Sequence, residues 1–126
     1  MTATPRRAAD AAESKPNPWW RWAFAVALAV QLVALYAPDA AGGPEVNGLD
    51  KVIHATIFAA PALAALMLGV PARWVLGLLV AHALLSELIQ HWALSHREGD
   101  VFDVVADIVG VLLGGLAYVV WNRRQP

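Results

Sequence analysis

The chain has 126 residues, of which 59% are hydrophobic and only 15% charged, and its mean hydropathy is +0.52. So apolar a composition leaves too little polar surface to cover a soluble globule of this size, and a lipid environment is the simplest explanation. A net charge of -1 with scattered Lys and Arg excludes a basic face for nucleic acid. The absence of cysteine excludes thiolate nucleophiles, disulfides and cysteine-ligated metals.

Residues 1–18 are polar, rich in Ala and Pro and of mixed charge, which predicts a disordered tail ahead of a membrane domain at 19–126. Four apolar segments follow, at 20–37, 52–70, 74–94 and 101–121. Each falls within the roughly 17–25 residues that a helix needs to cross a bilayer. Short linkers containing Pro and Gly separate them, so we expect an all-α bundle of four transmembrane helices running up and down.

The tryptophans support this prediction, because an indole ring prefers the headgroup layer of a membrane. All six lie at segment ends, at positions 19, 20, 22, 74, 92 and 121. Buried helices of a soluble bundle would not place every Trp there.

The first segment also resembles a cleaved signal peptide, since Ala37, Ala40 and Ala41 supply small residues after an apolar run. The long polar tail ahead of it, with Arg6-Arg7 far from the run, favours an uncleaved helix instead.

Lys and Arg predict the orientation of the bundle, because cytoplasmic loops carry an excess of them. Of the nine such residues, only Lys51 and Arg97 lie on the side opposite the termini. We therefore expect both termini in the cytoplasm.

Most of the remaining ionisable residues occur where the second helix starts, the third ends and the fourth starts, which an antiparallel bundle brings to one membrane face. They are Asp50, Lys51, His54, Glu87, Gln90, His91, Arg97, Glu98, Asp100, Asp103 and Asp107. The orientation places this face outside the cytoplasm. His82 lies on a different face of its helix from Glu87 and is expected to form contacts elsewhere.

The last segment carries an acidic stripe that continues into glycines. Asp100, Asp103, Asp107, Gly110 and Gly114 fall within about 80° of one another on a helix. The glycines permit close helix approach in the small-xxx-small manner, while the carboxylates face inward. Ionisable groups at that depth need partners, either Lys51, Arg97 and the histidines or a metal ion.

The polar motifs occur in a fixed order along the chain: Asp50-Lys51-x-x-His54, then Glu87-x-x-Gln90, then Arg97 and an acidic, glycine-spaced helix. This ordered set resembles the VanZ-like family of bacterial membrane proteins. The resemblance covers residues 50–114. It implies a role in the cell envelope, linked to glycopeptide resistance, in the cytoplasmic membrane. The chain has Asp107 where the family more usually has Asn, and Ser95-His96 replaces a small Pro-containing turn.

Three functions follow as hypotheses. The first is an extracytoplasmic site that binds or processes a lipid-linked or glycopeptide envelope component. Its candidate catalytic residues are Glu87, Asp103 and His54, and its candidate ligand-binding residues are Asp50, Lys51, Gln90, Arg97, Asp100 and Asp107. The second is a hydrolase or transferase with a divalent metal, for which the candidate ligands are His54, Glu87, His91, Asp103 and Asp107.

The third is a non-enzymatic assembly subunit, in which the polar residues only order the bundle. Asp50 and Lys51 are then a solvated helix end, Gln90 an interhelical hydrogen bond, and Glu87 and Asp103 members of buried ion pairs. The sequence leaves the reaction and the oligomeric state open.

Overall fold

The computed structural model describes residues 16–37, 48–93 and 100–125, and within these ranges all regular structure is helical. The helices are α2 (Trp19–Tyr36), α3 (Leu49–Met67), α4 (Ala72–Ala93) and α5 (Val101–Arg123). All four predicted segments are confirmed as helices, with bounds that shift by at most a few residues. All but the end of the predicted tail at 1–18 lies outside the described residues.

Both ends of α3 shift by three residues, and the helix stops at Met67 although the apolar run continues. Gly69 adopts φ 81° and its N–H donates to Leu66 O at 2.9 Å, while the Val70 N–H donates to Ala65 O at 3.2 Å. These two bonds form a Schellman motif, which satisfies the last carbonyls of the helix and turns the chain away. At the other end, Gly48 with φ 85° precedes the first turn.

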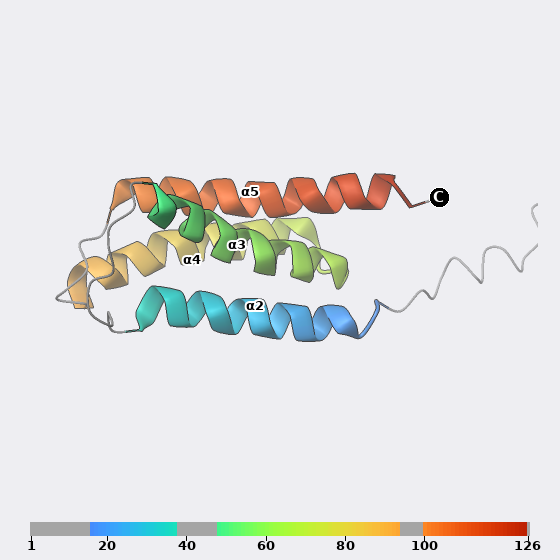
Figure 1. The fold of residues 1–126 in the computed structure, drawn as a ribbon, viewed down its shortest axis with the longest axis horizontal. Helices are drawn as coiled ribbons and strands as arrows, with labels where there is room; N and C mark the ends of the chain where they lie inside the picture. The colour runs from blue at the N-terminus through green and yellow to red at the C-terminus, as the bar shows by residue number, and fades with distance from the viewer. Residues whose placement is uncertain (1–15, 38–47, 94–99, 126) are drawn as a thin grey trace, which may run out of the picture.

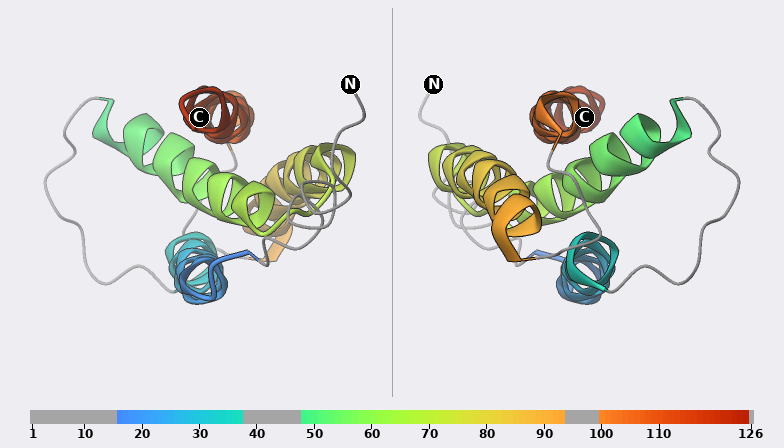
Figure 2. Two further views of the ribbon diagram at one scale, coloured as in Figure 1. Left: turned by 90° about the vertical axis from the view of Figure 1, so that its right-hand side faces the viewer. Right: turned by 90° about the vertical axis from the view of Figure 1, so that its left-hand side faces the viewer.

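Successive helices run in opposite directions, so α2 and α4 point one way and α3 and α5 the other (Figure 1). The first described helix begins, and the last one ends, at the same end of the bundle (Figure 1). Helix α3 is central: it contacts each of the other three and crosses between α5 and α2 in the view along the bundle (Figure 2). The up-and-down arrangement is therefore confirmed.

All four helices are long and apolar enough to cross a membrane. Their outward surfaces carry large hydrophobic side chains on every helix, including Val33, Leu78, Leu88 and Leu112, each more than half exposed. Water would make such a surface an aggregation liability, whereas lipid solvates it. The chain therefore has the character of a multi-pass membrane protein.

The backbones of α3 and α5 come into direct contact through small residues. A Cβ atom built on Gly110 would lie 2.1 Å from Ala55 O, and one built on Gly114 would lie 2.5 Å from Ala59 O. Gly110 and Gly114 are buried, as the predicted stripe requires. The small-xxx-small prediction for this helix is confirmed, with α3 as the neighbour.

We predict that Gly110→Ala destabilises the bundle by about 1–3 kcal/mol, because the new methyl group must displace the backbone of α3. Gly115→Ala is the matched control, since its Cβ would have only Leu76 Cδ2 within reach, at 3.7 Å. Thermal unfolding of both variants in detergent, followed by circular dichroism, measures the difference. Equal melting temperatures would show that α3 and α5 tolerate wider separation.

Candidate functional site

The candidate site lies at the end of the bundle where α3 begins, α4 ends and α5 begins (Figure 1). The start of α5 is attached to α4 by Asp100, its N-cap residue. The backbone N–H of Asp100 donates to Glu87 Oε2 at 2.9 Å, and Asp100 Oδ1 accepts from the Phe102 N–H at 2.9 Å. A side-chain cap and a carboxylate near the helix N-terminus are both favourable there.

Lys51 forms the outer rim of the site. Its Nζ donates to Asp100 Oδ2 at 2.8 Å, to Asp50 Oδ2 at 3.3 Å, and to Asp103 Oδ1. The bond from Lys51 lowers the pKa of the Asp100 carboxyl below its usual value, so Asp100 stays ionised at neutral and mildly acidic pH. The single lysine is thus already shared among three carboxylates.

His54 and Asp107 form the base of the site, one turn deeper. His54 Nδ1 and Asp107 Oδ1 are hydrogen-bonded at 2.9 Å, and both side chains are buried, with Asp107 0% exposed. On its other side, His54 Nε2 lies 3.8 Å from Asp50 Oδ1 and 3.9 Å from Asp103 Oδ2. The imidazole therefore joins the rim to the base.

Two carboxylate oxygens in the base have no hydrogen-bond partner among the described residues. They are Glu87 Oε1 and Asp107 Oδ2, and both are buried. Buried polar atoms in folded proteins are nearly always paired, so two such atoms in one cluster indicate room for a ligand, a proton or a cation.

The structure brings together most of the predicted site residues. The cluster contains Asp50, Lys51, His54, Glu87, Asp100, Asp103 and Asp107. Arg97 and Glu98 lie outside the described residues.

Two predicted site residues lie elsewhere. Gln90 Nε2 donates to the Leu35 carbonyl oxygen of α2 at 3.0 Å, which is the interhelical hydrogen bond given as its alternative role. His91 is exposed, its ring packs edge-on against Trp92 at 5.7 Å, and it belongs to neither group of metal-ligand geometry found in the described residues. It is therefore not placed as a ligand of the cluster.

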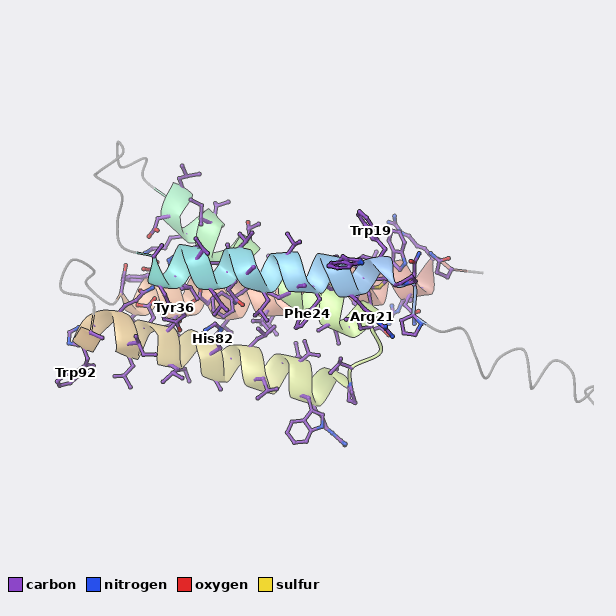
Figure 3. The ribbon with its side chains drawn as sticks, turned by 90° about the horizontal axis from the view of Figure 1, so that it is seen from below. Trp19, Arg21, Phe24, Tyr36, His82 and Trp92 are labelled. Carbon is purple, nitrogen blue, oxygen red and sulfur yellow. The ribbon has the colours of Figure 1, made fainter. Side chains whose placement is uncertain are left out.

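A second polar contact joins α2 to α4 through His82, which was expected to form contacts away from Glu87, although its partner was not predicted. The Tyr36 hydroxyl and His82 Nε2 are hydrogen-bonded at 3.1 Å, and the His82 ring also packs against Phe58 at 5.7 Å (Figure 3). Gln31 of α2 is fully buried, and its amide atoms have no partner among the described residues. A glutamine inside an apolar span was the available sequence signal for this buried polar group on α2.

The charge balance of the cluster favours cations over anions. Among the described residues its carboxylates outnumber Lys51 and His54, and Lys51 is already engaged. Two overlapping groups place one donor atom per residue within 4.8 Å of each other: His54 with Asp50 and Asp103, and His54 with Glu87 and Asp107. The cluster can therefore accept hydrogen bonds, hold a proton or coordinate a metal ion.

No protein-family model, curated protein or solved structure matches this chain. The resemblance to the VanZ-like family stays a prediction, and the functional argument depends on the residues of the cluster.

We predict that His54→Leu destabilises the protein by about 3–5 kcal/mol, because it leaves the Asp107 carboxylate buried without its partner. The double variant His54→Leu with Asp107→Ala should recover most of that loss, since this apolar pair has nearly the same total volume as the buried polar pair and replaces it at little cost. Thermal unfolding in lipid nanodiscs measures both. Additive losses in the double variant would show that the two side chains are not coupled.

Proposed function

We propose that this protein is a multi-pass protein of the bacterial cytoplasmic membrane whose acidic end faces outside and binds or processes a lipid-linked or glycopeptide component of the cell envelope. One observation carries the proposal: the buried carboxylates of the described residues all lie in one cluster at one end of the bundle, and exposure falls from its rim to its base. Asp50 on the rim is 64% exposed, whereas Asp107 at the base is 0% exposed. A ligand at headgroup depth could therefore contact the rim while reaching toward the base.

The chemistry of the rim supports a ligand rich in hydrogen-bond donors. Asp50 and Asp100 are exposed or half-buried carboxylates, which accept bonds from hydroxyl, amide and ammonium groups. Saccharide and peptide parts of envelope components carry such groups. Lys51 has its ammonium engaged by carboxylates, so a bare anionic ligand finds less support from it.

If the site processes its ligand, Glu87 is the preferred general base. Its Oε2 accepts the Asp100 N–H, while its Oε1 has no partner among the described residues and can accept a proton. Asp103 is less suited, because Lys51 holds its Oδ1 in an ion pair. His54 would then orient Asp107 and remain a secondary candidate.

The orientation is tested by single cysteines at Glu98 and Gln125, because the chain has no native cysteine. We expect an impermeant thiol reagent to label Glu98→Cys in intact cells and Gln125→Cys only after permeabilisation. The reverse labelling pattern would place the acidic end in the cytoplasm and contradict the proposal.

The envelope role is tested by expressing the chain in a glycopeptide-susceptible Gram-positive host and measuring the inhibitory concentration of teicoplanin. We expect wild type to raise it and Glu87→Gln to abolish the increase at matched membrane levels, since the amide has the same size but is not basic. Ser86→Ala is the control, because the Ser86 hydroxyl only donates to Ala83 O of its own helix.

If the host that expresses the wild-type chain is as susceptible to teicoplanin as the host without it, the envelope role is contradicted. Full activity in Glu87→Gln would favour the assembly subunit, in which the cluster only orders the bundle.

A further inference from the structure

We infer that His54, Glu87 and Asp107 form a binding site for one divalent transition-metal ion, such as Zn²⁺ or Mn²⁺. One donor atom from each residue lies within 4.8 Å of the others, and all three side chains are buried. Each comes from a different helix: α3, α4 and α5. The inference rests on the proposed function and changes one role in it, because a Glu87 oxygen bound to an ion no longer acts as the general base. The ion itself can be tested without any envelope ligand.

The unpartnered oxygens are the independent observation that points to an ion. Asp107 is completely buried, and its Oδ2 has no partner among the described residues, although its Oδ1 contacts His54. Glu87 Oε1 is also buried and has no partner among the described residues. A cation is the ligand that satisfies carboxylate oxygens on several residues at once.

Charge balance makes a divalent ion fit this base. The two carboxylates of Glu87 and Asp107 bring two negative charges into a poorly solvated place, where an unpaired charge is costly. A neutral imidazole and two carboxylates neutralise a doubly charged ion. The competing arrangement places a proton on His54 and another on one carboxyl, and the experiment below decides between them.

The donor set indicates which ion. One imidazole nitrogen and two carboxylate oxygens suit Zn²⁺ or Mn²⁺, whereas Mg²⁺ and Ca²⁺ prefer oxygen ligands alone. With bonds near 2.1 Å in tetrahedral geometry, ligand atoms lie roughly 3.4 Å apart. His54 Nδ1 would exchange its hydrogen bond to Asp107 Oδ1 for a bond to the ion, and Asp107 Oδ2, which has no partner among the described residues, is the oxygen available to bind it.

Three protein ligands leave at least one position of the ion open, as catalytic zinc sites do. In the proposed function that position would face the rim, where a phosphate or carboxylate oxygen of the envelope component could bind. An otherwise acidic site would thereby accept an anionic group.

The test uses the full chain in lipid nanodiscs, with its affinity tag removed and bound metal stripped by a chelator. Equilibrium dialysis against Zn²⁺, followed by elemental analysis, should give one equivalent per chain. Glu87→Gln and Asp107→Asn should each weaken binding by about 100-fold, since losing even an outer-shell partner of a ligand costs 10–100-fold. Replacing Zn²⁺ with Co²⁺ gives an optical spectrum that reports the ligand geometry.

Two controls identify the site. Asp50→Asn should bind as wild type does, which separates this group from the outer group of His54, Asp50 and Asp103. His91→Gln should also leave binding unchanged and so excludes capture by an exposed histidine. Gel filtration and circular dichroism establish that each variant is folded, and Glu87→Gln decides the outcome if Asp107→Asn does not fold.

Three results would overturn the inference: absence of one-equivalent binding by folded wild type, binding that persists in Glu87→Gln, or loss of binding in Asp50→Asn. Metal binding without any effect on teicoplanin susceptibility would leave the ion site in place and remove the envelope role. An effect on teicoplanin susceptibility without metal binding would support the envelope role and remove the ion site.

Discussion

Backbone contact between α3 and α5 is the constraint on which the rest of the structure depends. These two helices run in the same direction but cross (Figure 2), and Gly110 and Gly114 allow them to touch at Ala55 and Ala59. Because this contact fixes how α3 and α5 align, it also brings together the helical turns that precede it on each helix. Asp107 accordingly meets His54, and one turn further out Asp103 meets Lys51. A side chain at Gly110 would therefore affect the polar cluster as well as the packing of the bundle.

The same register divides the cluster into two parts with different energetics. Lys51, Asp50 and Asp100 are partly exposed at the rim, where an ion pair contributes little to stability and is screened by salt. His54 and Asp107 are buried, where removing one partner is costly. Glu87 connects the parts by accepting the N–H of Asp100, so α4 holds the start of α5 in place.

The sequence predicted the helices and their order because span length, tryptophan position and Gly or Pro linkers are local properties. It also predicted the inward face of α5, since helical period fixes which residues share a face. Period does not identify the neighbour: Gln90 lies one turn from Glu87, yet it bonds to Leu35 of α2 while Glu87 bonds to Asp100. The Tyr36–His82 contact depends on how α2 meets α4, which no local pattern specifies.

The bundle also has packing contacts that do not involve the polar cluster. Small residues bring α3 and α5 into contact, and a core that includes Leu35, Phe58 and Val111 packs three helices without any charged group. Apolar residues at positions 54 and 107 would complete such packing at little cost, because buried pairs gain little over well-packed hydrophobic ones. The polar residues are less favourable for stability than apolar ones would be, because two buried carboxylate oxygens have no partner in the described part of the chain. Buried groups that cost stability, gathered at one end of the bundle, are what the proposed ligand site requires.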